Sequence, residues 1–331
     1  MAVLYLTEQG SRLSREGNRF VLTREGQVLA EIPAGLVEAV YVFGNVSLTT
    51  PVITYLLRNG IDCVFLSQDG HYFGRLFASD SRFGLLRQRQ YLALTDPELR
   101  LRVSRLLVAG KVGNQISFLR RRGVSESQVE PLAVLQAEAR TARDHGHLLG
   151  LEGQASAVYY GLYRRLFKHD LGFRGRTRRP PRDPVNSLLS LGYTLLGYAG
   201  QSAVYAVGLD PFIGFLHSTH YSRPSLALDL IEEFRVLVDG LVLRVVNLGR
   251  YKAEDFRRSD EDPQGVLLTD EARKRYLADF EGLMARTVPY PGQERPVTVR
   301  RALELQARQL ARLVLGQQDS YRPLSFAPGG E

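Results

Sequence analysis

The stretch GFLHSTHYSRPSLALDLIEEFR, residues 214–235, brings imidazoles and carboxylates together in one passage from a loop into a helix. A helix is expected to begin at the Pro-Ser pair, because proline suits a first helical turn and apolar residues then recur at helical spacing. Asp229, Glu232 and Glu233 project from its other side, where Asp229 can neighbour either glutamate. His217 lies just before the helix. These groups predict a binding or catalytic site, unless the acids are surface charges on a solvated helix.

A second candidate is the carboxylate of Glu152 in HLLGLEGQASAVYYGLYRRLF, residues 147–167. On a helical wheel the leucines, tyrosines, alanine and valine of this segment form one apolar arc, and Glu152 lies inside it. A carboxylate there is costly unless it is paired, protonated or bound to a metal. Gly150 and Gly153 beside it leave room for a ligand or another backbone to approach. A buried glutamate paired with an arginine is the structural alternative.

Together, Glu152, His217 and a carboxylate from the 229–233 helix form a mixed oxygen and imidazole set. Oxygen-rich ligands suit Mg²⁺ or Mn²⁺, and one imidazole shifts the preference toward Mn²⁺. A competing interpretation uses His217 and His220 with Glu152 as a zinc hydrolase site, but the H-E-x-x-H helix is missing, so it ranks below. A core histidine bonded to a backbone carbonyl also remains open for His217.

Positive charge is concentrated in the later part of the chain. Residues 1–80 carry six arginines against eight acids, a net charge of −2. Since the formal net charge of the whole chain is +8, residues 81–331 carry a net charge of +10. A polyanion such as nucleic acid would therefore meet the second part. Five arginines in HDLGFRGRTRRPPRDP, residues 169–184, are expected to lie on a flexible loop that could grip DNA phosphates: Arg174, Arg176, Arg178, Arg179 and Arg182. A solvated linker is the alternative.

The elements that must position these groups change character near residue 80. Up to that point, short apolar or alternating runs punctuated by REGN, REGQ and QDGHYFG predict strands with tight turns, interrupted by a short helix in TTPVITYLLRNG. Beyond it, apolar residues recur at helical spacing over 85–108, 112–122, 128–143, 147–168, 184–207, 224–246, 270–286 and 298–315. We expect an α+β protein with a β domain over 1–80 and an almost all-helical domain over 81–331. The tail RPLSFAPGGE is expected to fray.

The composition favours a folded cytoplasmic protein. At 331 residues and 44% hydrophobic content the chain can build two cores. Its single cysteine, Cys63, lies in an apolar run and is interpreted as a small buried hydrophobe, which fits a reducing compartment. The stretch MAVLYLTEQG has no basic segment followed by a cleavable apolar run, and no apolar run approaches the roughly 20 residues of a membrane span, so we expect neither export nor membrane insertion. A P-loop and a G-x-S-x-G nucleophile elbow are also missing.

Nine blocks of the sequence, in order, resemble one known family, the CRISPR-associated endonucleases that integrate new spacers and are the larger of the two universal adaptation proteins. The blocks are LYLTEQGSRLSREGNRFVL, IPAGLVEAVYVFGNVSLTT, GIDCVFLSQDGHYFGRL, KVGNQISFLRR, LLGLEGQASAVYY, DPVNSLLSLGYTLL, GFLHSTHYSRPSLALDLIEEFR, GVLLTDEARKRYL and RALELQARQLARLVLG. Because they span nearly the whole chain, the resemblance is specific.

The resemblance implies a metal-dependent DNA endonuclease and strand transferase of antiviral defence, active on double-stranded DNA. It implies metal ligands at Glu152, His217 and Glu232, with Asp229 as a further acidic position. It also implies a homodimer built largely through the β domains and a larger complex with the small universal partner protein. The arginines of residues 174–182 lie in a region that varies among relatives, so their role does not transfer.

Two questions stay open at this point. The wheel of an isolated helix places Glu232 nearly opposite the apolar arc, where it would be merely solvated, whereas the resemblance places it in the site. A DNA-binding scaffold without chemistry would explain the basic half of the chain, but it leaves the carboxylate of Glu152 on an apolar face unexplained. A zinc hydrolase would explain the ligands but not the charge.

Overall fold

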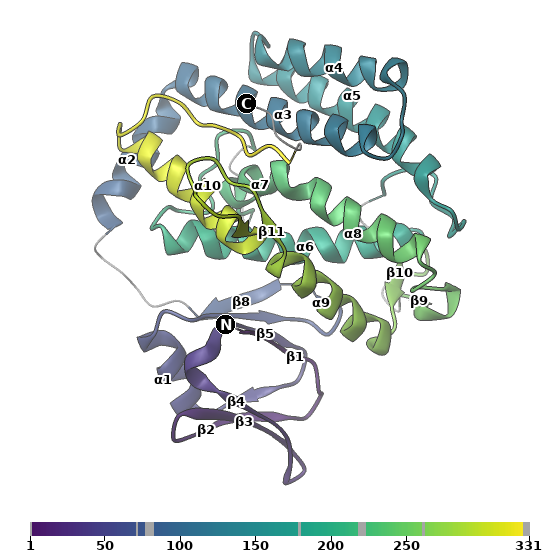
Figure 1. Cartoon of the computed structure of the whole chain (residues 1–331). Coiled ribbons are helices and arrows are strands. Elements are labelled where there is room, and N and C mark those ends of the chain that lie inside the picture. The colour runs from purple at the N-terminus through teal and green to yellow at the C-terminus, as the bar shows by residue number, and fades with distance from the viewer. Residues whose placement is uncertain are drawn as a thin grey trace. The chain divides into compact units, whose positions relative to one another are not determined.

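The computed structural model describes residues 2–70, 72–76, 83–177, 180–217, 223–259 and 262–326. The chain divides into two compact units, Met1–Ser81 and Arg82–Glu331. Figure 1 shows mainly strands in the first unit and mainly helices in the second. This succession confirms the predicted α+β class.

The first unit contains two four-stranded sheets and one helix. One sheet has the strand order β1-β5-β7-β8, in which β5 pairs in parallel with β1 and β7, and β8 is antiparallel. The other has the order β4-β3-β2-β6. The bounds are β1 Ala2–Leu6, β2 Arg12–Glu16, β3 Arg19–Arg24, β4 Gln27–Pro33, β5 Val37–Phe43, β6 Ser47–Leu48, α1 Thr50–Arg58, β7 Asp62–Leu66 and β8 Tyr72–Leu76.

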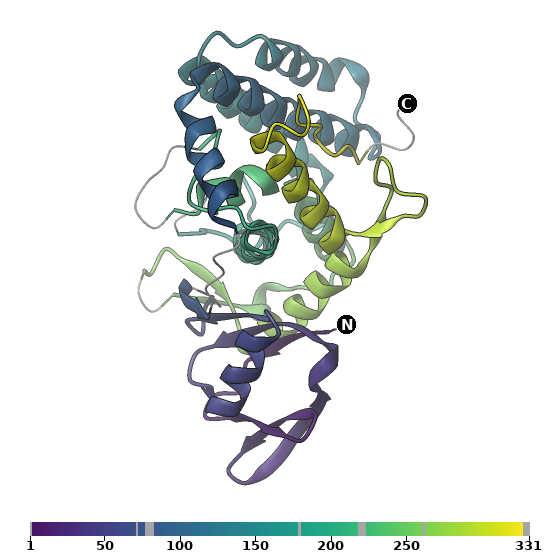
Figure 2. The ribbon, with the colours of Figure 1, turned by 90° about the vertical axis from the view of Figure 1, so that its left-hand side faces the viewer.

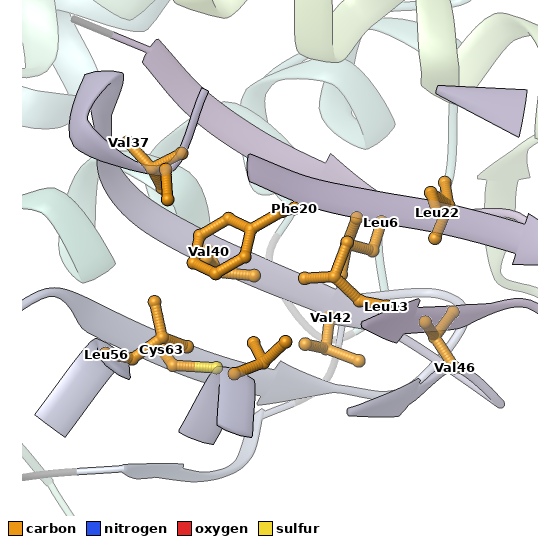
Figure 3. Packing of buried hydrophobic residues seen from close by; sticks show 12 residues of the cluster. Leu6, Leu13, Phe20, Leu22, Val37, Val40, Val42, Val46, Leu56 and Cys63 are labelled. Carbon is orange, nitrogen blue, oxygen red and sulfur yellow. The ribbon is translucent and has the colours of Figure 1, made fainter. Parts of the chain in front are cut away.

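Alternating apolar residues of both sheets form the core of this unit. Leu6 and Val40 of one sheet and Leu13 and Phe20 of the other belong to one buried cluster (Figure 3). The turn of REGQ is a two-residue hairpin loop in which both residues have positive φ, 51° at Glu25 and 79° at its glycine. Such turns match the twist of antiparallel strands, which is why this short motif predicts a hairpin correctly.

The second unit is built from helices with two short antiparallel ribbons, β9-β10 and β11-β12. Its bounds are α2 Gly84–Thr95, α3 Pro97–Arg120, α4 Glu126–Arg140, α5 His145–Tyr163, α6 Pro184–Ala206, α7 Ser225–Ile231, α8 Arg235–Asn247, β9 Phe256–Arg258, β10 Val266–Leu268, α9 Asp270–Ala285, β11 Thr287–Val288, β12 Val297–Thr298 and α10 Val299–Val314. Figure 2 looks almost along α6, a largely buried helix, with other helices around it.

One predicted helix boundary is wrong. The sequence suggested a break between residues 108 and 112, but α3 runs through it, and the break lies instead at Asp96, whose side chain caps the first turn of α3 next to Pro97. Gly110 and Gly113 do not end the helix. Their missing side chains let neighbouring segments approach α3 closely. A Cβ on Gly110 would lie 2.4 Å from Pro323, and one on Gly113 would lie 2.5 Å from a side-chain atom of Gln136.

Three smaller expectations have clear outcomes. Cys63 is fully buried, and burial raises the pKa of its thiol to about 12, so it is the inert hydrophobe that the sequence indicates. Over the described ranges, no helix is both long and apolar enough to cross a membrane. The expected fraying of the tail is wrong for residues 322–326, because Leu324 is buried and its carbonyl oxygen accepts a hydrogen bond from Asn114 of α3.

Candidate metal centre

Three segments of the helical unit meet around one buried lysine. Lys111, in the middle of α3, is only 6% exposed. Its ammonium group is ion-paired with Glu152 of α5 and lies 2.7 Å from Oε2 of Glu232. Glu232 opens the 3₁₀ turn η4, Glu232–Phe234, which joins α7 to α8. Two carboxylates that are 80 residues apart in the chain therefore converge on the same positive charge.

Glu232 is buried and surrounded by cations. Nε of Arg235 donates a hydrogen bond of 2.9 Å to its Oε1. Burial alone would raise the pKa of this carboxyl, but the charges of Arg235 and Lys111 outweigh that effect and hold the pKa well below its usual range. Oε2 is ion-paired with Lys111, but the angles at this contact are not those of a hydrogen bond. Glu232 thus stays ionised and keeps one oxygen without a hydrogen bond.

His217 reaches the same place with its ring already oriented. Its Nδ1 lies 2.6 Å from Oδ1 of Asp229, and because a carboxylate can only accept, Nδ1 carries the proton. The other ring nitrogen, Nε2, lies 4.0 Å from Oε1 of Glu232. A histidine whose outer nitrogen is bonded to a carboxylate in this way presents the lone pair of Nε2, which is how histidines are set up to bind metals.

Asp229 is saturated by the loop that carries His217. It is fully buried, and its two oxygens accept hydrogen bonds from the backbone N–H groups of Phe215, Leu216 and His217 in addition to the imidazole. Gly214 makes this approach possible, since a Cβ there would lie 2.7 Å from Oδ2 of Asp229. The GFLH sequence is therefore a loop wound around one carboxylate, and Asp229 orients the histidine.

The residues fit a divalent cation that binds oxygen and one imidazole. Over the described ranges, no three histidine, cysteine or acidic side chains are grouped as a ready-made cluster. Lys111 lies between two of the three candidates and supplies the positive charge that their carboxylates need. An ionised carboxylate oxygen without a hydrogen bond, a second carboxylate and an imidazole lone pair form the donor set that Mg²⁺ or Mn²⁺ would take.

The surface of α5 is open at the two glycines beside Glu152. A Cβ on Gly150 or Gly153 would meet no other atom within 4 Å. Glu152 lies between them and keeps 22% of its side chain exposed, and Ser156 donates a 3.1 Å hydrogen bond to its Oε1. The predicted room for a ligand beside Glu152 is therefore present in the helix surface.

Glu233, the third acid of the sequence motif, faces away from this group. It is fully buried and accepts hydrogen bonds from Tyr321, from the backbone N–H of Leu324 and from Gln306. Burial raises the pKa of its carboxyl to about 7, although these bonds oppose the rise. Asn114 of α3 donates to the carbonyl oxygens of Glu233 and Leu324. Glu233 therefore fastens the C-terminal segment to η4.

A buried tyrosine network supports the arginine that holds Glu232. Arg235 lies 4.7 Å above the ring of Tyr193, whose hydroxyl is bonded to Asp239. The hydroxyl of Tyr159 also donates to Asp239, at 2.7 Å. Burial raises the pKa of the Asp239 carboxyl to about 6. This network fixes the ring on which Arg235 rests.

The structure describes three of the five arginines expected in the basic loop. Arg174 is ion-paired with Asp170, and Arg176 donates hydrogen bonds of 2.8 Å to Asn186 and 3.0 Å to Ser190. Arg182 is exposed. Arg178 and Arg179, like His220 of the zinc alternative, lie outside the described residues. The segment also buries an aromatic ring, that of Phe173, which the sequence interpretation overlooked.

Lys111 and Arg235 were missed by the sequence interpretation. A signal for Lys111 was present, because it stands alone as a charge within the apolar run of α3, just as Glu152 stands alone within the apolar arc of α5. Two lone charges of opposite sign on two apolar faces are expected to pair. Arg235 follows directly in the same motif, one turn after Glu232.

Comparison with known sequences gives one family. The profile described as "CRISPR associated protein Cas1" matches residues 4–282. The CRISPR-associated endonuclease Cas1 3 of Thermus thermophilus is 37% identical over 328 residues, covering 98% of this chain and 97% of the relative. The CRISPR-associated endonuclease Cas1 2 of Rhodospirillum rubrum is 38% identical over 338 residues, covering 97% of each.

Solved structures share the fold. A CAS1 protein from Thermotoga maritima is 28% identical and superposes with a TM-score of 0.83 over 100% of both chains. A casposase bound to an integration product is 22% identical, with a TM-score of 0.85 over 100% of this chain and 96% of the other. At that lower identity the second likeness shows the fold alone.

Proposed function

Because the chain belongs to the CRISPR-associated Cas1 family, we propose that it is a divalent-metal-dependent DNA endonuclease and strand transferase that inserts new spacers into a CRISPR array. The observation that carries this proposal is the convergence of Glu152 and Glu232 on one ammonium group, with Nε2 of His217 4.0 Å from the second carboxylate. The relatives named as Cas1 endonucleases support the reaction class.

Glu152, His217 and Glu232 would hold the cation, which is Mg²⁺ or Mn²⁺. When bound, it supplies neutralisation of charge on the phosphodiester oxygens and a more acidic attacking hydroxyl, either of water or of a DNA 3′ end. Asp229 keeps the proton on Nδ1 of His217, so that Nε2 is free to act as a ligand. Each residue thus has a separate task that follows from its present contacts.

The neighbouring cations of the chain complement an anionic substrate. Arg235 holds Oε1 of Glu232 in place. Lys111 holds both carboxylates close together before a cation enters. Since a transferred phosphoryl group spreads negative charge over its oxygens, positive side chains held rigidly beside it lower the cost of that charge.

For partners, we propose double-stranded DNA, a second copy of this chain, and the small adaptation protein. A fold neighbour was solved as part of a Cas6-RT-Cas1–Cas2 complex, with a TM-score of 0.84 over 99% of this chain and 36% of that chain. By this analogy the small partner is a protein of the Cas2 type, and two dimers of the present chain would flank it.

A strand-transfer assay tests the function. A short duplex with free 3′ ends is incubated with the protein, the small partner and a plasmid carrying a CRISPR repeat, with Mn²⁺ or with chelator. We expect joined product only with the metal, and none from Glu152→Gln even though that variant still binds DNA. Full joining by Glu152→Gln would overturn the assignment. DNA binding without any joining by the native protein would favour a scaffold.

A further inference from the structure

Four arginines from three separate helix ends gather at one place outside the metal centre. Arg121 and Arg122 follow α3, Arg244 lies in the last turn of α8, and Arg286 follows α9 directly. All four are exposed. We call them the helix-end arginines. Arg121 and Arg122 end the short basic run FLRRR, but Arg244 and Arg286 lie more than 120 residues further along the chain, so the sequence alone does not show that the four come together.

Helices α3 and α8 carry this place at a fixed distance from the metal centre. They lie one above the other in Figure 1 and run in the same direction. Asn114 of α3 bonds to the carbonyl of Glu233 just before α8, and further along a Cβ on Gly240 would lie 3.5 Å from Nη2 of Arg122. With 1.5 Å of rise per residue, Arg122 lies about 16 Å along α3 from Lys111.

Two of the helix-end arginines, Arg122 and Arg244, line a hollow on the surface. It has a volume of about 310 Å³ and is lined by Arg122, Leu166, Gly240, Leu243, Arg244 and Asn247. The guanidinium of Arg122 lies 3.5 Å above the ring of Phe118 and donates a 3.0 Å hydrogen bond to the carbonyl of the same residue. A guanidinium fixed in this way is preorganised to present its remaining N–H groups to a phosphate.

Among the residues that the structure describes, these charges have no carboxylate partner. Across the described ranges, none of the helix-end arginines forms an ion pair, whereas Arg120 at the same helix end is paired with Glu126. Partial burial, Arg244 and Arg121 together lower the pKa of Arg286, which shows that like charges act on one another here. The attraction between a cation and the last carbonyl groups of a helix can account for one arginine at each helix end. It does not explain why arginines from three helix ends lie close enough to act on one another.

We infer that the helix-end arginines bind backbone phosphates of the DNA whose phosphodiester lies at the metal centre. This inference rests on the proposed function and adds a second, separate contact for the same duplex. The 16 Å along α3 correspond to about five base pairs at 3.4 Å per pair. The contact reads no bases, since arginines on phosphates fix position rather than sequence.

The test compares two triple variants that remove the same charge. Arg122→Gln, Arg244→Gln and Arg286→Gln are combined in one protein. The control combines Arg19→Gln, Arg301→Gln and Arg308→Gln, whose arginines are ion-paired with Glu31 or Glu304. Affinity for a fluorescent 30-base-pair duplex is measured over a range of salt concentrations. We expect the slope of log K against log salt to become shallower by about 2 to 3 in the first variant, since each lost phosphate contact removes about 0.9. The control should keep the native slope.

A labelling experiment locates the DNA independently. Leu248, which is 73% exposed one turn after Arg244, is changed to cysteine (Leu248→Cys), and the native Cys63 is fully buried and contributes no background. DNA should slow maleimide labelling of this position about tenfold, and the arginine variant should remove the protection.

An unchanged salt slope with native DNA binding, or labelling that DNA does not slow, would overturn the inference and leave the proposed function standing. If the native protein binds no duplex at any salt concentration, the proposed function fails first and the inference fails with it. Circular dichroism confirms that each variant is folded.

Discussion

Two adjacent glutamates occupy opposite environments on the two sides of η4. Both are buried, at 4% and 0% exposure. Glu232 is surrounded by the charged groups of Lys111 and Arg235, which hold its pKa well below the usual range. Glu233 meets only the neutral donors of Tyr321, Gln306 and a backbone N–H, so burial raises its pKa to about 7.

The difference shows that the partners of a buried acid, rather than its burial, indicate its role. A carboxylate among cations remains ionised and can exchange one cation for another. A carboxylate among neutral donors is a structural acceptor, here for the C-terminal segment. Although the two glutamates are about equally buried, their partners therefore distinguish a candidate metal ligand, Glu232, from a residue that fastens the C-terminal segment, Glu233.

The largest effect is expected from Glu232→Gln, which would remove a ligand oxygen and its charge. Metal ions contribute several kcal/mol of transition-state stabilisation, so strand transfer should fall about 10³-fold. The rate of joining at saturating Mn²⁺ measures this. The matched control is Glu233→Gln, which should retain most of the activity of the correctly folded protein. A larger defect in Glu233→Gln would reverse the assignment of the two residues.

Lys111→Met sharpens the contrast by removing the cation that both candidate ligands share. Without it, two apposed carboxylates lose their buried counter-charge, and the free energy of unfolding should fall by about 3 kcal/mol in the absence of metal. Mn²⁺ should then raise the melting temperature more in the variant than in the native protein, because no ammonium competes for the carboxylates. An equal or smaller rise in the variant would show that Lys111 does not occupy the place of the cation.

Asp239→Asn tests a third buried acid through its pH dependence. Its pKa is raised by burial from 3.8 to about 6, so the native protein gains stability from protonating it. This stability is fully present below about pH 3.8 and is lost as the pH rises through 6. The native protein's stability relative to Asp239→Asn should therefore decline by at most about 3 kcal/mol between pH 4 and pH 7. Urea unfolding at several pH values measures the difference, and a constant difference would refute the assigned shift.

The smallest effect is expected from Asp229→Asn, because this residue orients His217 and is not expected to bind the metal. Loss of such a supporting carboxylate costs about 10- to 100-fold in metal affinity. Calorimetric titration with Mn²⁺ measures it. Complete loss of binding in a folded Asp229→Asn protein would mean that Asp229 is itself a ligand.

Much of the fold was predictable because its signals are local. The REGQ hairpin, the α1 segment and most helices follow from turn residues and periodicity. The helix boundary within 85–122 could not be predicted, because Gly110 and Gly113 normally weaken a helix. They are tolerated here because the C-terminal tail and α4 pack closely against them, which the local sequence does not show. The tail itself looked free, because its anchor, Glu233, lies almost 90 residues earlier.

The candidate ligands could be named from the sequence, whereas the cations that surround them could not. A helical wheel assumes one buried side, and it therefore treats Glu232 as solvated. The segment is instead covered on several sides, and η4 turns more tightly than an α-helix, so that Glu232 faces α3. Lys111 stands out in its own segment as a lone charge, but that segment does not show which groups it pairs with, because its partners belong to two other elements.

Anomalous diffraction from crystals soaked in Mn²⁺, recorded at the manganese absorption edge, tests the central claim most directly. We predict a peak within bonding distance of Glu152, Nε2 of His217 and Glu232, with the ammonium of Lys111 moved away from both carboxylates. A map with no peak between these three side chains, or with a peak beside Glu233 instead, would contradict it.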